Sequence, residues 1–161
     1  MALRHLLLGA ALVLAASAAL AEVLVGRVVA VADGDTLTVL DASRRQRKVR
    51  LAGIDAPEKK QPFGNVSRQS LGQLTQGKQV LVEWHKRDRY GRLVGKVYVD
   101  NLDVNLEQIR RGLAWHYVEY ANEQSLADRT SYSVTEHGAR SARRGLWQDS
   151  SPIPPWEWRR K

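Results

Sequence analysis

The order of strand-like and helix-like segments is the feature that most constrains how this 161-residue chain can fold. Five segments are rich in β-branched residues or alternate between apolar and polar positions, which is typical of strands, and turn signals such as Asp33-Gly34 separate them. Apolar residues at helical spacing mark three further segments. The predicted strands span residues 23–32, 35–40, 46–54, 80–86 and 92–99, and the predicted helices span residues 62–77, 102–113 and 121–143.

That order indicates an α+β fold. Three strands, a helix, two strands and then further helices place one helix between the third and fourth of five strands. The OB-fold has this arrangement, and it is a small Greek-key β-barrel that often binds oligonucleotides. Asp103 is expected to cap the second helix, and Gly112 lies near its expected end. We therefore predict an OB-fold five-stranded Greek-key β-barrel with about three packed α-helices.

The N-terminal segment has the pattern of an export signal. Arg4 and His5 precede an apolar, alanine-rich run over residues 6–20, and Ala19-Leu20-Ala21 fits a signal peptidase site. The run is short for a membrane span, which needs about 20 residues. We predict a signal peptide over residues 1–21 and an exported protein, periplasmic or secreted; an uncleaved N-terminal anchor is the alternative.

The remaining chain divides into one domain and a tail. Residues 22–149 are enough for a single domain with a core of ordinary size. Residues 150–161 form a Pro- and Trp-rich basic segment ending in Arg-Arg-Lys, and the sequence leaves open whether this tail packs on the domain or stays mobile. The chain contains no cysteine. Disulfides, thiol chemistry and thiolate zinc sites are therefore excluded, and stability must come from packing and bound ions.

The chain is strongly basic, with a formal net charge of +8 from 25 Lys and Arg against 17 Asp and Glu. Such an excess attracts polyanions, of which nucleic acid is the first candidate, ahead of anionic lipids and cell-wall polymers. Charge by itself does not distinguish these partners, because many basic exported proteins bind no nucleic acid. The distinction depends on where the acidic residues lie.

Acidic and basic residues gather in three short clusters, 33–36, 50–58 and 88–92. Asp35 opens a strand directly after a glycine turn and Asp55 ends another at a proline turn, so both can stand at one rim of a barrel. Their oxygens, with a backbone carbonyl and waters, suit Ca²⁺, whereas Mg²⁺ demands a stricter octahedron. No histidine lies in the clusters, which argues against Zn²⁺. Asp35 alone would be an ordinary turn residue, but the set predicts a calcium site.

Arginines and a third carboxylate complete the chemistry of a phosphodiesterase. Phosphodiester hydrolysis builds negative charge on a five-coordinate phosphorus, and a guanidinium offers fixed paired donors to those oxygens. Glu58 lies three residues beyond Asp55, where it can activate a water as general base or only orient it. Strict alternation would put Arg50 and Asp55 on opposite faces of a strand. We expect the strand to end before Asp55, with a bulge at Gly53 as the alternative.

Together the clusters resemble the staphylococcal nuclease (thermonuclease) family. The matching motifs are Asp-Gly-Asp-Thr at 33–36, Val-Arg-Leu at 49–51, Ile-Asp-Ala-Pro-Glu at 54–58 and Asp-Arg-Tyr-Gly-Arg at 88–92. The similarity extends from Val23 to about Trp147, and the Pro-Pro-Trp-Glu-Trp tail resembles exported bacterial members. The resemblance implies an OB-fold barrel and Ca²⁺-dependent hydrolysis of DNA and RNA, with cleavage of the P–O5′ bond to leave 3′-phosphate ends.

The resemblance also assigns roles to residues at the matching positions. The implied calcium ligands are Asp35, Asp55 and the backbone carbonyl of Ala56. The implied catalytic residues are the phosphate-binding Arg50 and Arg92, with Glu58 as the base or water-orienting group. The expected substrate contacts are Arg89, Tyr90 and Tyr117. The protein is expected to act on DNA and RNA as a monomer, without stable membrane association once the signal is removed.

Two departures from the family pattern bear on the expected activity. The best-known members have threonine where Ala56 stands, but a backbone carbonyl is the expected ligand there, so the change is tolerable. The segment 59–62 is shorter than the long loop of those members. The shorter loop bears on substrate preference more than on activity.

Other conspicuous residues are interpreted as structural. Three histidines lie in different segments without ligand spacing, and they are His85, His116 and His137. Trp84 and Trp115 are expected to fill core or rim positions, with base stacking as the alternative. The basic run 44–48 is expected to be a solvated hairpin tip, although it could add phosphate contacts.

Two other functions stay open. A non-catalytic OB-fold module could hold nucleic acid or another polyanion in the same groove. A pure binder would not need Asp35, Asp55 and Glu58 together, because clustered carboxylates repel phosphate unless a cation intervenes. An envelope-associated protein could instead bind anionic polymers through its basic tail. Truncation after Trp147 that left envelope association untouched would exclude that function.

Overall fold

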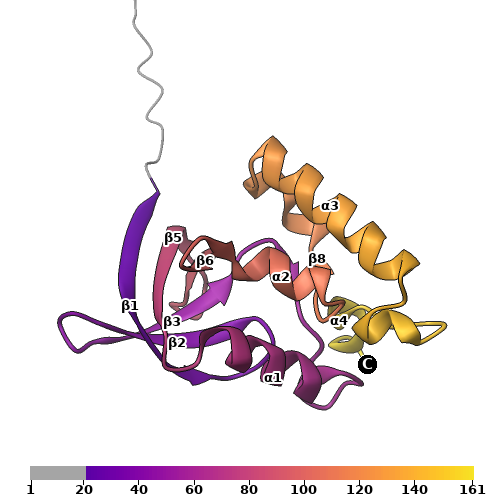
Figure 1. The fold of residues 1–161 in the computed structure, drawn as a ribbon, viewed down its shortest axis with the longest axis horizontal. Coiled ribbons are helices and arrows are strands. Elements are labelled where there is room, and N and C mark those ends of the chain that lie inside the picture. The colour runs from indigo at the N-terminus through magenta and orange to yellow at the C-terminus, as the bar shows by residue number, and fades with distance from the viewer. Residues whose placement is uncertain (1–20) are drawn as a thin grey trace, which may run out of the picture.

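Five strands close into a barrel in the computed structural model, which describes residues 21–161 (Figure 1). Neighbouring strands pair antiparallel in the order β3-β2-β1-β5-β6, and β3 pairs parallel with β6 to complete the ring. The barrel strands are β1 (Glu22–Val31), β2 (Thr36–Asp41), β3 (Gln46–Leu51), β5 (Gln79–Arg87) and β6 (Leu93–Val99). The helix α1 (Gly64–Thr75) lies between the third and fourth of them. The predicted α+β OB-fold is confirmed.

The barrel interior is filled by side chains from alternate strand positions. Leu37 of β2 lies opposite Val49 of β3, and Val49 lies opposite Leu93 of β6, so three buried side chains line up across neighbouring strands. Leu71 of α1 and Ile109, both fully buried, join the same core from outside the barrel. Ile109 belongs to α2 (Val104–Arg110), which follows the short edge strand β7 (Leu102–Asp103). The helices therefore cover the barrel with apolar side chains.

Local capping sets the helix boundaries. The Asp103 carboxylate accepts a hydrogen bond from the Leu106 amide at 3.0 Å, so the predicted cap of α2 is confirmed. The predicted third helix over residues 121–143 starts too early, because residues Val118–Glu123 form a 3₁₀ segment. The helix α3 (Leu126–Ser141) begins only after Ser125, whose hydroxyl accepts from the Asp128 amide. The Ser125 cap therefore sets the start of α3 in place of a helix that extends further toward the N-terminus.

The strand β3 is shorter than predicted. It ends at Leu51 instead of residue 54, because Gly53 has a φ of +73° and turns the chain out of the barrel. The chain then forms β4 (Ile54–Asp55), which pairs with β8 (Trp115–His116) in a separate two-stranded sheet. The expected end of the strand before Asp55 is therefore confirmed. The turn allows Arg50 and Asp55 to meet although they are five residues apart.

The C-terminal tail packs on the domain, which resolves the alternative left open by the sequence. After the 3₁₀ segment η2 (Gly145–Gln148), the chain returns to form α4 (Pro155–Trp158), and Figure 1 shows α4 and the C-terminus beside β8. The Gln61 side-chain amide donates to the Ile153 carbonyl at 2.6 Å. Trp156 meets Trp115 edge to face, with ring centroids 5.6 Å apart.

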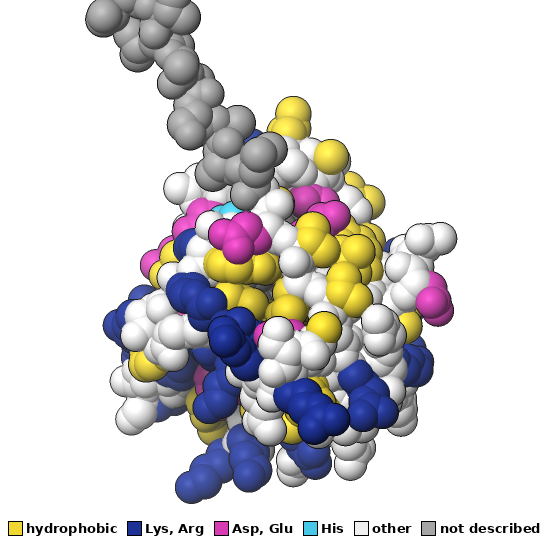
Figure 2. Space-filling model, turned by 90° about the vertical axis from the view of Figure 1, so that its left-hand side faces the viewer, with side chains coloured by type: hydrophobic (Ala, Val, Ile, Leu, Met, Phe, Trp, Pro, Cys, Tyr) yellow, Lys and Arg dark blue, Asp and Glu magenta, His cyan; other side chains and the backbone are white. Residues whose placement is uncertain are grey.

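The side of the barrel that carries β1 has a basic part and a hydrophobic part. Lys and Arg side chains gather over one half of this face, and exposed hydrophobic side chains gather over the other (Figure 2). The basic run 44–48, expected to be a hairpin tip, lies only partly in the turn between β2 and β3, because residues 46–48 already belong to β3. Arg47 pairs with Asp41 at 3.1 Å. Except for Ala21, the predicted signal peptide lies outside the described residues. No helix in the described part of the chain is long and apolar enough to cross a membrane.

The turn at Gly53 provides a test of how the rim is built. Gly53→Ala should lower the free energy of unfolding by about 1–2 kcal/mol, because an L-residue is strained at positive φ. The added Cβ would also lie 2.3 Å from the Gln124 side-chain nitrogen. Urea denaturation of residues 22–161, which contain every described strand and helix, measures the effect.

Gly72→Ala is the matched control for this substitution. Gly72 lies inside α1, where an added Cβ meets nothing within 4 Å. The substitution should raise the free energy of unfolding by about 0.5–1 kcal/mol, because alanine is the better helix former. If Gly53→Ala were as stable as the unmodified protein, the left-handed turn would not be what ends β3.

Candidate active site

All nine residues that the sequence predicted as metal, catalytic or substrate positions line one groove at the rim of the barrel. The groove has a volume of about 600 Å³. They come from all three sequence clusters and from the segment after β8. They are Asp35, Arg50, Asp55, Ala56, Glu58, Arg89, Tyr90, Arg92 and Tyr117. The structure therefore brings together every predicted metal, catalytic and substrate position. The roles of these residues remain predictions.

Arg50 lines the groove and pairs with both buried aspartates. Its Nη2 donates to Asp55 at 2.9 Å, and its Nη1 lies 3.2 Å from Asp35. The same Nη1 donates to the carbonyls of Leu51 and Ile54, at 3.0 and 2.9 Å. The Arg50 side chain is 15% exposed and that of Asp55 only 1%. This arginine is therefore a structural counter-ion for the acidic rim as well as a group facing the groove.

The two aspartates are fixed by contacts between the segments that carry them. Asp35 follows the turn that joins β1 to β2, and its carboxylate accepts from the Ala56 amide at 2.7 Å. It also accepts from the Thr36 hydroxyl at 3.1 Å. The Asp35 carbonyl accepts from the Leu51 amide at 2.8 Å, which ties the start of β2 to the end of β3. These bonds place the first and second sequence clusters side by side.

Negative charge is crowded at this rim. Burial, together with the neighbouring Asp35 carboxylate, raises the pKa of Asp33 to about 7. Burial also raises the pKa of Asp55, although Arg159 and Arg50 oppose the shift. In both cases burial is the largest cause, and the charge of a neighbouring carboxylate adds to it. A bound cation would relieve that repulsion.

The donor set fits a hard cation. Asp35, Asp55 and the Ala56 carbonyl offer oxygen atoms only. Within residues 21–161, no cluster of three or more His, Cys, Asp and Glu side chains could hold a metal ion. A cation at the rim would therefore depend on two carboxylates, a main-chain carbonyl and water. Ca²⁺ accepts such a mixed oxygen shell, whereas Zn²⁺ prefers imidazole and thiolate.

Arg92 reaches the groove from the third cluster and is held by its own turn. The Asp88 carboxylate accepts from the Arg92 side-chain Nε at 2.7 Å and from the Arg92 amide at 3.0 Å. The Arg92 Nη1 lies 3.4 Å from the Thr36 hydroxyl, which in turn bonds to Asp35. Arg92 thus lies beside the acidic rim without pairing to either buried aspartate.

Glu58 lies in a tight turn after β4. Its amide donates to the Gln61 side chain at 3.0 Å, and its carbonyl accepts from the Gln61 amide at 2.8 Å. Its side chain is 40% exposed, so solvent water can reach it. Its carboxylate is not free, because Arg159 donates to it at 2.7 Å.

Aromatic side chains line the groove on the solvent side. Tyr90 is 67% exposed, and the guanidinium groups of Arg89 and Arg92 lie 4.9 and 5.4 Å from its ring centroid. Tyr117 stacks on Trp156 with ring centroids 5.3 Å apart and an interplanar angle of 13°. One face of Tyr117 is therefore covered, whereas most of the Tyr90 side chain is exposed to solvent.

The residues set aside in the sequence have structural surroundings. His116 is buried and contacts the Gln124 side chain at 2.8 Å, and Trp115 packs in a small cluster with Trp147. His85 lies 4.0 Å from Glu123, and His137 is exposed on α3. None of these four residues lines the groove.

Sequence reasoning missed several charged groups of the groove, among them Asp33 and Arg159. Asp33 was within the first cluster but was interpreted only as a turn residue; its position two before Asp35 could have marked a third carboxylate. Arg159 pairs with Asp55 and Glu58 from the end of the chain. No local signal could have revealed it, because its partners lie about a hundred residues away.

Comparison with known proteins gives consistent matches. The family model described as "Staphylococcal nuclease homologue" matches residues 48–149. An "Uncharacterized endonuclease" of Escherichia coli is 46% identical over 137 residues, covering 84% of this chain and 85% of that protein. A protein of the same description from Haemophilus influenzae is 41% identical over 135 residues, covering 84% of this chain and 72% of the other. The "Probable staphylococcal-like nuclease CAN1" of Oryza sativa is 39% identical over 142 residues, covering 80% of this chain and 41% of that protein.

The two groove arginines should differ in their effect on stability. Arg50→Ala should lower the free energy of unfolding by about 2–4 kcal/mol, because it leaves two buried carboxylates short of their counter-ion. Arg92→Ala should lower the free energy of unfolding by at most about 1 kcal/mol, because its partner Asp88 is 19% exposed and can be solvated. Urea denaturation in EGTA, which removes divalent cations, measures both. Equal costs would show that Arg50 is not the structural counter-ion of the rim.

Proposed function

Because the chain belongs to the staphylococcal nuclease family, we propose that it is an exported, calcium-dependent nuclease that hydrolyses DNA and RNA with little sugar specificity. The observation that carries this proposal is the convergence of two buried aspartates, two arginines and an accessible glutamate in one groove. A phosphodiester needs positive donors around its oxygens and a group that can take a proton from water. The groove offers both.

The two arginines would bind the scissile phosphate. A guanidinium has five N–H donors, and three of those of Arg50 already donate to Asp55 and two carbonyls. The remaining donors of Arg50, and those of Arg92 not bound to Asp88, can face a phosphate. Because both guanidinium groups are held before substrate arrives, little orientation is lost on binding. Both stay charged at any working pH and can stabilise the charge that develops on phosphorus.

Glu58 would act on the attacking water. The water oxygen forms a bond to phosphorus while its proton passes to the Glu58 carboxylate, or to solvent where Glu58 only orients the water. The P–O5′ bond breaks and its electron pair stays on O5′, which takes a proton from solvent and becomes a 5′-hydroxyl. The phosphate remains on the 3′ oxygen. Asp35, Asp55 and the Ala56 carbonyl would hold Ca²⁺, which when bound supplies positive charge to polarise the phosphate.

The groove surface supports a substrate recognised by its backbone and base planes. Lys86, Arg87 and Arg89 line the groove together with Tyr90, whose ring is exposed. Basic side chains contact phosphates of either nucleic acid, and an aromatic ring can stack on any base. Neither kind of contact reads the sugar. These residues, with Tyr117, are the proposed substrate contacts of a monomeric enzyme.

Export is proposed from the signal-like segment 1–21, with the mature protein in the periplasm or the medium. A basic, cysteine-free protein can work in either place, because it needs no disulfide to fold and meets extracellular Ca²⁺ and nucleic acid there.

A digestion assay tests the metal and the reaction together. Purified residues 22–161 should cut single- and double-stranded DNA and RNA in Ca²⁺, and cutting should stop when EGTA removes the cation. Gel electrophoresis follows the products, and susceptibility of their ends to a 3′-phosphatase identifies the bond that was broken. Cutting in Mg²⁺ alone would retain the nuclease and reject calcium. Retarded but uncut nucleic acid in every lane would favour the binding module.

Substitutions test the assigned residues. Glu58→Ala and Arg92→Ala should each lower kcat by about 10²–10³-fold, if losses seen for oxyanion-stabilising groups apply to phosphoryl transfer. Arg110→Ala is the matched control, because Arg110 is 48% exposed, pairs with Glu107 and lies outside the groove. Its rate should equal that of the unmodified protein. Undiminished cutting by Glu58→Ala would reject the role of Glu58 while leaving the nuclease assignment intact.

A further inference from the structure

Arg159 bridges the two carboxylates that the proposed reaction needs most. Its Nη2 donates to Asp55 Oδ2 at 2.8 Å, and its Nη1 lies 3.2 Å from Asp55 Oδ1 and 2.7 Å from Glu58 Oε1. Asp55 is the proposed calcium ligand, and Glu58 is the proposed base. With Arg50 on Oδ1 as well, both oxygens of Asp55 accept from guanidinium groups. A single side chain from the end of the chain therefore engages both groups.

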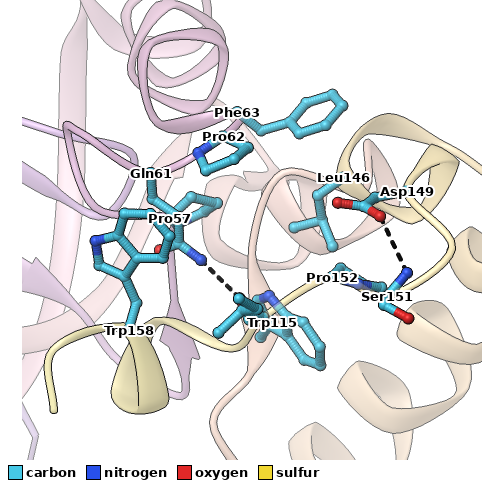
Figure 3. Close-up of a pocket in the computed structure, with 11 residues that line it drawn as sticks. Pro57, Gln61, Pro62, Phe63, Trp115, Leu146, Asp149, Ser151, Pro152 and Trp158 are labelled. Carbon is cyan, nitrogen blue, oxygen red and sulfur yellow. Dashed lines mark hydrogen bonds between the residues drawn. The ribbon is translucent and has the colours of Figure 1, made fainter. Parts of the chain in front are cut away.

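The segment that carries Arg159 is anchored on the domain. Trp158 rises from α4 toward the turn formed by Pro57 and Gln61, beside a small cavity of about 60 Å³ (Figure 3). Trp156 stacks on Tyr117, and Gln61 donates to the Ile153 carbonyl. These contacts hold α4 next to Glu58. Arg159 therefore reaches the groove from a segment that is packed against the domain.

The contacts of Arg159 conflict with a cation on Asp55. Ca²⁺ binds carboxylate oxygens at about 2.3–2.6 Å. The Arg159 nitrogens already lie 3.2 and 2.8 Å from the two carboxylate oxygens of Asp55. Two positive groups on one carboxylate also repel each other. The Arg159 side chain is 42% exposed, whereas Asp55 is 1% exposed. The Arg159 side chain can therefore move into solvent while Asp55 remains buried and Trp156 and Trp158 keep their contacts.

We propose that Arg159 is an autoinhibitory latch, which occupies Asp55 and Glu58 until Ca²⁺ displaces it. This inference rests on the calcium site of the proposed function. While latched, the two oxygens of Asp55 already accept three guanidinium contacts, and the Glu58 carboxylate is held by the same Arg159 side chain. The apparent calcium affinity is the intrinsic affinity reduced by the fraction of molecules that are unlatched. The tail thus sets the calcium concentration at which the enzyme becomes active.

Calcium binding, measured by calorimetry on residues 22–161 without substrate, tests the latch independently of activity. Arg159→Ala should bind Ca²⁺ about ten-fold more tightly than the unmodified protein, as expected for loss of a partly exposed bidentate ion pair. Arg159→Lys, which keeps the charge but loses the bidentate geometry, should lie between the two. Melting in EGTA confirms that each variant is folded.

Arg160→Ala is the matched control, and Asp55→Asn identifies the site. Arg160 carries the same charge on the neighbouring residue and forms no ion pair within residues 21–161. Arg160→Ala should therefore bind Ca²⁺ as the unmodified protein does, and Asp55→Asn should bind it at least ten-fold more weakly. Equal gains in affinity for Arg159→Ala and Arg160→Ala would reduce the effect to net charge and overturn the latch.

Three further outcomes separate this inference from the proposed function. Equal calcium affinity for the unmodified protein and Arg159→Ala would overturn the latch and leave the calcium site intact. An increase in KM for DNA with that unchanged affinity would make Arg159 a substrate contact instead. If neither protein bound Ca²⁺, the calcium site itself would fail and the latch with it.

Discussion

The pairing of Arg50 with two buried aspartates is the interaction on which the rest of the site depends. Two carboxylates that are almost inaccessible to water would repel each other and favour unfolding or protonation without a cation between them. Arg50 supplies that charge from within the barrel wall, since β3 also pairs with β2 and β6. Its bonds to the Leu51 and Ile54 carbonyls make the same side chain close the turn at Gly53. Site and barrel rim are therefore one structure, and a change in either disturbs the other.

The parallel closure of the barrel explains why the third cluster reaches the first two. Val49 pairs with Leu93, and Arg50 pairs with Val94. Arg92 directly precedes β6, so the register that closes the barrel also fixes the distance between the two arginines along the rim. A slip of one residue would turn every core side chain of β6 outward. The hydrophobic core therefore specifies the position of Arg92 in the groove.

Much of this arrangement could be predicted from the sequence because it depends on local or periodic signals. Alternation located the five barrel strands, the Asp103 cap located α2, and turn residues placed Asp35 and Asp55 at strand ends. The start of α3 could not be predicted. A helix capped at Ser125 after a 3₁₀ segment and a helix that begins earlier differ little in free energy. Arg159 could not be predicted at all, because its position depends on how Trp156 and Trp158 seat the tail. Such packing of distant segments has no local signal in one sequence.

The groove contains two kinds of positive charge that balance its carboxylates. Arg50 is 15% exposed and bound to four acceptors or carboxylates, so it cannot leave without unfolding the rim. Arg159 is 42% exposed and binds the same Asp55 from outside. Removing Arg50 leaves buried negative charge uncompensated. If a cation replaces Arg159, one counter-ion of Asp55 is only exchanged for another. A rim that keeps one charge permanently and exchanges the other can bind a divalent cation without first being assembled by it. That is the electrostatic basis we propose for control of this protein by calcium without an effect on its fold.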